Sequence, residues 1–376
     1  MQMWPPTILA LACLAAATPQ AAPKPPSPSL DVKIERNNNT ILTVTIRNTG
    51  PQDVRVLRPG SLLDSRPLRK VRVSYGGKEL LFTGMSVYIS MSDLDDSAFE
   101  TLPAGSIYKS SLDIAESHDM SQSGTYGVKA AGTLWATVTD MEGLQTVPFE
   151  SNALTLDIVA PPARLPPSLT KRGVNDYQGL PSKHLTLHQD AHSACTQRDL
   201  RAIMAAVHNC RNFVRRAKSA ARCGGQSRMW YYFKSSNFKT RHYVKSALDE
   251  MGRICSQTCG EFPKVMCEHR TDQENCDPGT LALITRGETV IRFCPLFFRK
   301  PDRSSVRWAD DQVSILLHEL AHLCGFEHDY AYGKSVVHLA QNESVQNPDS
   351  YVGFARDATY LPEGDPACPD YPTRVA

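Results

Sequence analysis

Apolar and polar residues alternate along several short segments in the first half of the chain. The run 41–46 reads Ile-Leu-Thr-Val-Thr-Ile, and asparagines at 37–39 separate it from a similar run at 30–34. Alternation with a period of two, interrupted by Asn, Gly, Pro and Asp, is typical of half-buried antiparallel strands. Further strands are predicted at Val54–Leu57, Val71–Tyr75, Thr125–Val128, Leu134–Val138 and Leu154–Val159. We therefore expect a β-sandwich in this half.

The second half has a helical period instead. Apolar residues between 200 and 214 recur every three or four positions, and Thr196 with Asp199 forms a capping box in front of them. Two more helices are predicted, at 240–254 and 310–323. Two strands are predicted between them, at 280–285 and 290–293. The helix at 310–323 begins at Asp310 or Asp311, where a carboxylate suits the helix dipole. The second half is predicted to be an α-rich α+β domain.

Proline-rich stretches divide the chain into domains. The apolar run 8–17 is too short to cross a bilayer, which takes about 20 residues, and it is typical of a signal peptide. A proline-rich stretch follows at 21–29. A second one, the linker 160–172, ends at Lys171-Arg172, a dibasic pair that predicts cleavage by a kexin-like processing protease. The expected divisions are a signal peptide at 1–19, a first domain at 20–172 and a second domain at 173–376.

The cysteines lie almost entirely in the second domain. Ten of the eleven fall between residues 195 and 368, and residues 23–194 contain none. An even number in one part of an exported chain predicts disulfides formed in an oxidising compartment. A cysteine-ligated metal site is disfavoured, because Cys255 and Cys259 are the only close pair. The formal net charge of +2 gives no reason to expect a nucleic-acid or membrane-surface partner.

The sequence His-Glu-Leu-Ala-His at 318–322 carries the chemistry. Residues four apart share one helix face, so His318 and His322 can present their imidazoles to a single metal ion. Glu319 is then placed to take a proton from a water molecule at that metal. Zinc in such a site polarises a peptide carbonyl and lowers the pKa of water. The motif predicts a zinc metalloendopeptidase with Glu319 as its base.

Catalytic zinc usually has three protein ligands, and the residues leave three candidates for the third. His328 completes the metzincin pattern His-Glu-x-x-His-x-x-Gly-x-x-His, but that pattern also needs a downstream methionine, and the last methionine is Met266. Glu343 lies near the distance that thermolysin-like enzymes use, although inside an Asn-Glu-Ser glycosylation sequon. The third candidate is Asp329.

Asp329 opens a segment that resembles a known signature. Residues 329–333, Asp-Tyr-Ala-Tyr-Gly, resemble the Asp-x-x-Tyr-Gly motif of the deuterolysin family, the fungal neutral protease 2-like aspzincin metalloendopeptidases. Other segments are similar to family motifs in the same order: Tyr-Tyr-Phe-Lys-Ser at 231–235, Phe-Cys-Pro-Leu-Phe at 293–297 and Asn-Pro-Asp-Ser-Tyr at 347–351. The first half, with Thr-Ile-Arg-Asn-Thr-Gly at 45–50, is similar to the family's propeptide. The insert between His322 and Asp329 is shorter than is usual in the family.

The resemblance implies roles for particular residues. It implies one Zn²⁺ per catalytic domain and the following site: metal ligands His318, His322 and Asp329, general base Glu319, and oxyanion donor Tyr332. It also ties Asp349 either to support of the metal or to a preference for lysine after the cleaved bond, and we assign this residue to substrate binding. A structural carboxylate that caps a helix is the alternative. The disulfides that it suggests are Cys195–Cys267 and Cys276–Cys294, and six cysteines are left unpaired.

Together these patterns predict a secreted zinc metalloendopeptidase made as a zymogen, with a β-sandwich propeptide and an α-rich α+β zincin-like catalytic domain. Protein or peptide substrates are expected, preferably basic, because residues 304–376 contain four Lys or Arg and eleven Asp or Glu. We expect a monomer with no nucleic-acid partner and no stable membrane association. Two alternatives are a metzincin-type protease that uses His328 and a non-catalytic secreted zinc-binding effector. Glycosylation at Asn38 and Asn342 is left open.

Overall fold

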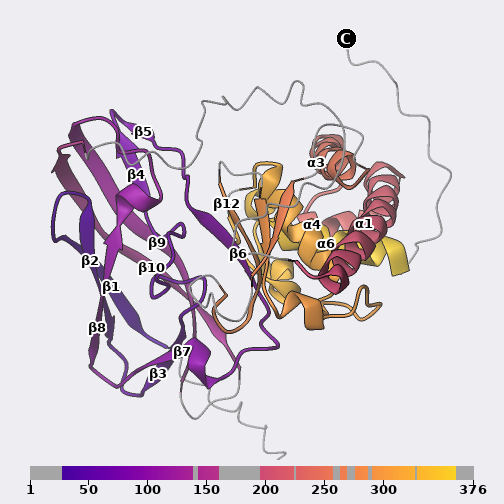
Figure 1. The fold of residues 1–376 in the computed structure, drawn as a ribbon. Coiled ribbons are helices and arrows are strands. Elements are labelled where there is room, and N and C mark those ends of the chain that lie inside the picture. Colours follow the sequence, from indigo (N-terminus) through magenta and orange to yellow (C-terminus); the bar gives the residue numbers. More distant parts are fainter. Residues whose placement is uncertain are drawn as a thin grey trace, which may run out of the picture.

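The computed structural model describes residues 28–138, 143–160, 195–223, 226–256, 263–268, 276–286, 290–326 and 328–360. The predicted signal peptide, the Lys171-Arg172 pair and Cys368 lie outside these residues. Among the described residues, no helix has both the length and the apolar character needed to cross a membrane. In Figure 1 the strands of the first half stand on one side and the helices of the second half on the other.

Antiparallel strands in two sheets make up the first half. One sheet has the order β1-β2-β8, and the other has the order β5-β4-β9-β3-β7 with β10 paired to β9. The strands are β1 (Leu30–Arg36), β2 (Ile41–Asn48), β3 (Val54–Leu57), β4 (Arg72–Tyr75), β5 (Lys78–Glu79), β7 (Phe99–Leu102), β8 (Ile107–Asp113), β9 (Gly124–Val138) and β10 (Gln145–Ile158).

Inward-facing residues of the two sheets share one core. On β2, the side chains of Leu42, Val44 and Ile46 are fully buried while those between them are partly exposed, as the alternation predicts. They belong to the same cluster as Val73 and Val128 of the other sheet. Each such aliphatic side chain contributes roughly 1.5–3 kcal/mol by leaving water. A one-residue slip would expose this whole face, so the core also fixes the strand register.

The strand β9 differs from the prediction. The sequence predicts two strands, at 125–128 and 134–138, but β9 continues without interruption through both. The small residues at 130–132 resemble a break between strands. However, β10 pairs with Ala131 and Gly132 and places Phe149 opposite Gly132. Cross-strand pairing therefore outweighs the weak strand preference of Ala and Gly at this point.

Helices dominate the second half, and two of them start at the predicted caps. The Asp199 carboxylate accepts from Thr196 N at 2.8 Å, and Asp199 N donates to the Thr196 hydroxyl at 3.2 Å. Asp311 accepts from Ser314 N at 2.8 Å and caps α4. The elements are α1 (Gln197–Cys223), α2 (Gln226–Phe233), α3 (Phe238–Ser256), β11 (Lys264–Cys267), β12 (Thr280–Thr285), β13 (Val290–Phe293), α4 (Gln312–Leu323), α5 (Gln341–Ser344) and α6 (Pro348–Tyr360). This is the α+β arrangement that the sequence predicts.

Disulfides and an apolar core join these elements. The bonds Cys195–Cys267 and Cys276–Cys294 are those that the family resemblance implies, so both pairings are confirmed. A further bond, Cys210–Cys255, ties α1 to α3, and the sequence had left its partners open. The core cluster contains residues of α1, α3, α4 and α6 together with residues of the three strands.

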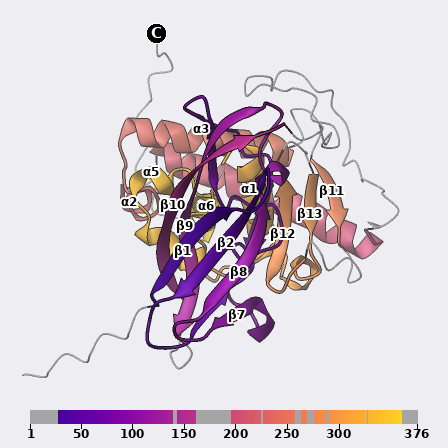
Figure 2. The same cartoon turned by 90° about the vertical axis from the view of Figure 1, so that its left-hand side faces the viewer.

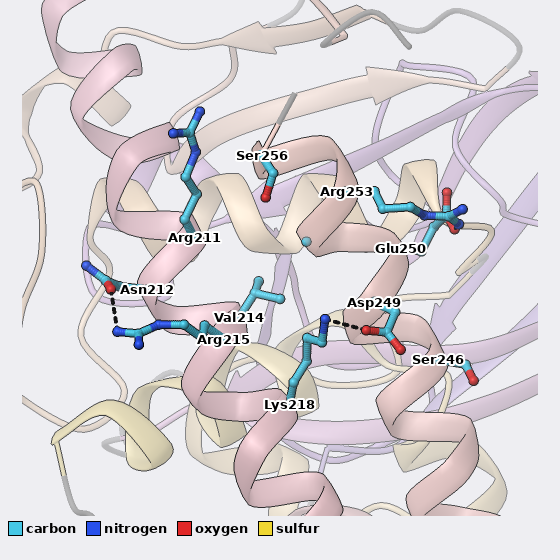
Figure 3. A pocket seen from close by; sticks show the side chains of 11 residues that line it. Arg211, Asn212, Val214, Arg215, Lys218, Ser246, Asp249, Glu250, Arg253 and Ser256 are labelled. Carbon is cyan, nitrogen blue, oxygen red and sulfur yellow. Dashed lines mark hydrogen bonds and ion pairs between the residues drawn. The ribbon is translucent and has the colours of Figure 1, made fainter. Parts of the chain in front are cut away.

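The basic residues of α1 face a charged groove beside α3 (Figure 3). Lys218 forms an ion pair with Asp249 of α3, and Arg215 donates to the Asn212 side chain at 3.1 Å. Because partners within the groove already engage Lys218 and Arg215, we interpret these basic residues as part of a solvated face. Exposed pairs of this kind contribute about 0–1 kcal/mol each.

One strand of the first half belongs to the sheet of the second half. That sheet has the order β11-β13-β12-β6, and its edge strand β6 (Met85–Ile89) pairs antiparallel with β12. Figure 1 shows β6 beside β12 at the boundary between the halves, and Figure 2 shows the strands of the first half in front of the helices of the second. The sequence pattern predicts two domains separated by the linker 160–172 and contains no sign of a shared sheet.

Candidate active site

Helix α4 places His318, Glu319 and His322 inside the molecule. Its apolar residues pack into the core of the second half, and Leu316 and Leu320 are fully buried. Because the two histidines are one turn apart, their Nε2 atoms lie 3.2 Å from each other. His318 and Glu319 have no exposed surface, and His322 is 4% exposed. The motif is therefore an interior cluster and not a pair of surface histidines.

A tight turn after α4 brings Asp329 back to the histidines. Gly325 adopts a φ of +98°, which residues with side chains rarely tolerate. The chain reverses there, and the carbonyl of Phe326 lies 2.8 Å from Nδ1 of His322. A carbonyl only accepts, so Nδ1 carries the proton and Nε2 keeps a free lone pair. Oδ1 of Asp329 lies 3.1 Å from Nε2 of His318 and 3.3 Å from Nε2 of His322.

Asp349 lies behind His318, in the first turn of α6. Its Oδ1 is 2.8 Å from Nδ1 of His318, and its Oδ2 accepts from the backbone N–H of Gly333 at 2.6 Å. A carboxylate on the second nitrogen of a metal-binding histidine fixes the orientation of the ring and raises its basicity. The sequence predicts Asp349 as a substrate contact. In the structure its side chain is 3% exposed, and both oxygens face groups of the protein itself.

The charges of the cluster suit a bound cation. Burial alone would lower the pKa of His318, but Asp329 and Asp349 outweigh it and raise this pKa to about 10. Burial would raise the pKa of Asp329, but His322 and His318 hold it well below its usual range. The three ligand atoms of His318, His322 and Asp329 lie within 4.8 Å of one another. Two imidazole nitrogens and a carboxylate oxygen are a donor set of open catalytic zinc sites, so these residues fit one Zn²⁺.

Glu319 is next to this cluster and lacks a partner. Neither of its carboxylate oxygens has a hydrogen-bond partner among the described residues, although both are buried. Desolvation raises the pKa of this carboxyl to about 8. A buried polar group without a partner is costly, typically about 1–3 kcal/mol, so its retention calls for an explanation. A role in exchanging protons near neutral pH would explain why this carboxyl is retained.

Tyr332 brings a hydroxyl to the same place. Its ring centroid lies 6.0 Å from that of His318, with 19° between the ring planes. Its hydroxyl donates to the main-chain carbonyl of Val87 in β6 at 3.0 Å. Burial, with a further contribution from Asp329, raises the pKa of Tyr332 well above its ordinary value. The phenol therefore keeps its proton and can act as a donor.

Nearly the whole chain is similar to known proteins. The profile of the deuterolysin metalloprotease (M35) family matches residues 3–361. The chain belongs to this family. The neutral protease 2 homologs of Colletotrichum graminicola and Phaeosphaeria nodorum are each 30% identical to it, over 353 and 358 residues. These matches cover 92% and 93% of this chain and 96% and 97% of the two relatives.

A solved structure, a zinc peptidase from Grifola frondosa, is 20% identical over 43% of this chain and 97% of its own, with a TM-score of 0.36. Membership of the deuterolysin family makes this protein a zinc metalloendopeptidase, so the predicted family and enzyme class are confirmed. The non-catalytic effector is thereby set aside.

The two other candidate ligands lie elsewhere in this deuterolysin. Nε2 of His328 is 2.7 Å from Nη1 of Arg69, and burial together with Arg69 lowers the pKa of His328 to about 4. The neutral ring thus faces an arginine of the first half. Glu343 accepts from Ala340 N at 3.0 Å at the start of α5. Among the described residues, neither side chain belongs to the group that could hold a metal ion, whereas Asp329 does.

Two residues that shape the deuterolysin site were not predicted. Asn347 fixes the loop between Asp329 and Tyr332, because its Oδ1 accepts from Ala331 N at 3.1 Å and its Nδ2 donates to Ala331 O at 3.0 Å. Its place in the 347–351 segment was the only signal for it. Tyr88 of β6 stacks on His318, with ring centroids 4.0 Å apart. No sequence pattern connects Tyr88 with a motif so far along the chain.

Proposed function

We propose that the chain is the zymogen of a secreted zinc metalloendopeptidase. Residues 1–19 direct export, 20–172 form a β-sandwich propeptide, and 173–376 form the catalytic domain. A kexin-like protease cleaves after Arg172. The confinement of ten cysteines to the second half supports this division, and the disulfides found there suit an oxidising compartment.

In this proposal His318, His322 and Asp329 hold one zinc ion per catalytic domain. The support is the convergence of three ligand atoms from α4 and the following loop. When bound, zinc polarises the scissile carbonyl and lowers the pKa of water. Three protein ligands leave one coordination position open, as catalytic zinc sites do and closed structural sites do not. Asp349 keeps the His318 ring in the ligating orientation.

Glu319 transfers the protons, and Tyr332 donates a hydrogen bond. Glu319 takes the proton of the attacking water and passes it to the nitrogen of the leaving amine. Burial raises the pKa of Glu319, which makes its carboxylate more basic and favours transfer of the proton from water to it. Tyr332 donates a hydrogen bond to the carbonyl oxygen of the substrate as negative charge develops on it.

The preferred substrates are basic proteins or peptides. Residues 304–376 contain four basic and eleven acidic side chains, although Asp311, Glu319, Asp349 and Asp357 among the acidic ones are buried. The net negative charge of this segment raises the local concentration of cationic chains, and the effect weakens as salt shortens the Debye length below about 10 Å. The mature enzyme acts as a monomer, with neither a nucleic-acid partner nor stable membrane association.

The observation that carries the proposal is the unpartnered Glu319 beside the group of His318, His322 and Asp329. The experiment compares the wild-type chain, cleaved after Arg172 and separated from its first half, with the Glu319→Gln variant. Both should bind one zinc, while casein hydrolysis by Glu319→Gln falls about 10²–10⁴-fold, the usual contribution of a general base. A fully active Glu319→Gln enzyme would refute the proposed role of Glu319.

A further inference from the structure

The strand β6 is the point where the first half enters the active site. It completes the sheet of the second half as the edge strand, with Val87 opposite Leu283 and Tyr88 opposite Ala282 of β12. The backbone N–H of Ser90, just after β6, donates to Gly279 O at 2.8 Å and extends the pairing. Main-chain pairing to a sheet edge binds an extended segment with little dependence on its sequence. Without β6, the edge of β12 would be exposed and would be a docking strand for peptides.

The side chain of Tyr88 covers the catalytic helix. Its ring lies flat on the imidazole of His318, with 5° between the planes and 4.0 Å between the centroids. Its hydroxyl donates to Asp310 Oδ1 at 3.3 Å, next to the N-terminal cap of α4. The residue is 4% exposed, so it is buried between the two halves. One face of His318 is thus shielded by a residue that cleavage at Arg172 would place on a separate chain.

The backbone of β6 accepts the hydrogen bond of Tyr332, the proposed oxyanion donor. The carbonyl that accepts from the Tyr332 hydroxyl is a peptide carbonyl, that of Val87. In the reaction, Tyr332 donates to the carbonyl of the substrate. An extended strand that offers a peptide carbonyl to Tyr332 while it pairs with β12 presents the features that a substrate would present. A substrate cannot use Tyr332 until β6 has left.

Contacts on either side of β6 fasten the first half to the second. Arg66 donates to Thr280 Oγ1 at 3.3 Å and forms an ion pair with Asp277 at 3.4 Å. After β6, Asp93 pairs with Lys300. None of these contacts depends on the linker that joins the two halves. They remain available when the linker is cut.

We propose that the first half is a tight-binding protein inhibitor of the second half. Within this inhibitor, β6 acts as a substrate-like strand. Cleavage of the linker alone therefore does not activate the enzyme. This inference rests on the proposed function for the role of Tyr332. Cleavage turns an intramolecular contact, with an effective concentration in the millimolar range for flexible linkers, into a bimolecular one. The complex then persists until it is diluted below its dissociation constant or the first half is degraded. Activation is a two-step process.

The test uses the full chain loaded with zinc and cleaved after Arg172. Tyr88→Ala removes the ring from His318, whereas Tyr88→Phe keeps the ring and loses only the hydroxyl. Ile107→Ala, at an exposed position on β8 in the other sheet, is the matched control for a change in the first half. Two readouts are taken on each cleaved protein: the dissociation constant of the two halves, from dilution and size-exclusion chromatography, and the hydrolysis of a fluorogenic lysine-containing peptide.

We expect cleaved wild-type, Tyr88→Phe and Ile107→Ala proteins to elute as complexes and to be nearly inactive until dilution separates the halves. Tyr88→Ala should weaken association at least about tenfold, a change of about 1.4 kcal/mol, and its activity should appear at correspondingly higher protein concentration. Full activity of the cleaved wild-type complex would overturn the proposal. Equal dissociation constants for Tyr88→Ala and Tyr88→Phe would overturn it as well.

The same data separate this inference from the proposed function. If the isolated second half hydrolysed nothing, the proposed function would fail. The dissociation constants would still decide whether β6 is the docking strand. If the isolated second half were active but cleaved wild-type protein were equally active as a complex, only the inhibitory role of β6 would fail.

Discussion

Replacement of Asp349 by Asn tests how strongly α6 supports the metal site. The substitution keeps the size of a side chain that is 3% exposed, so it creates no cavity. Asp349 accepts from two donors, Nδ1 of His318 and the N–H of Gly333. An asparagine has one acceptor oxygen, so its amide nitrogen must face one of these two donors. The variant therefore loses a charge-assisted hydrogen bond and leaves a buried donor unpaired.

The size of the effect follows from that lost bond. Loss of a carboxylate behind a metal-binding histidine typically weakens metal affinity by about 10–100-fold, which is about 1.4–2.8 kcal/mol. A hydrogen bond to a charged group contributes about 1.5–3 kcal/mol, which agrees with that range. Because zinc binds the folded chain, its stabilising effect on unfolding should shrink by the same amount.

The assay is competition for zinc against a chromogenic chelator, with melting temperatures recorded in zinc and in chelator. Asp357→Asn is the matched control: it changes the same residue type on the same helix, where Asp357 accepts from Nε of Arg307 at 3.1 Å. We expect a zinc dissociation constant about 10–100-fold higher for Asp349→Asn than for Asp357→Asn. If the two constants agree within about twofold, Asp349 does not support the metal site and the reasoning is wrong.

Three further predictions concern the disulfide between α1 and α3, a buried histidine of the first half and the loop before Tyr332. Replacing both Cys210 and Cys255 by Ala removes the bond between α1 and α3 and should lower the free energy of unfolding by about 2–4 kcal/mol in denaturant titrations; an unchanged midpoint would refute this. Burial lowers the pKa of His118 to about 4. The folded state therefore excludes a proton that the unfolded state binds below a pH of about 6.5. The free energy of unfolding should fall as the pH decreases from about 6.5 towards 4. Zinc-free protein should lose about 2 kcal/mol from this group between pH 7 and pH 5, and His118→Gln should show a smaller loss. Asn347→Ala frees both backbone groups of Ala331 and should lower kcat by loosening Tyr332, so an unchanged kcat would count against a positioning role.

The elements with a strong local signal were predictable from the sequence. The alternation on β2, the Thr196 cap of α1 and the apolar face of α4 are local patterns, and each appears where expected. The pairing of His318 and His322 follows from helix geometry alone. The choice among Asp329, His328 and Glu343 depends on how the chain turns at Gly325, and spacing did not decide it.

Features that need partners distant in sequence could not be predicted. β6 is a strand only because β12 accepts it as an edge, and β12 lies almost 200 residues further along the chain. The stacking of Tyr88 on His318 follows from that pairing, so it was hidden for the same reason. The length of β9 depends likewise on β10, which overrides the weak strand preference of the residues at 130–132.

The assignment of His318, His322 and Asp329 as the zinc site can be tested by the zinc content of purified Asp329→Ala and His328→Ala proteins after dialysis against a weak chelator. His328 contacts Arg69 and not the histidine pair, so His328→Ala should retain one zinc per chain, as the wild type does. Asp329→Ala should lose nearly all of its zinc. Retention of zinc by Asp329→Ala together with loss from His328→Ala would contradict the claim.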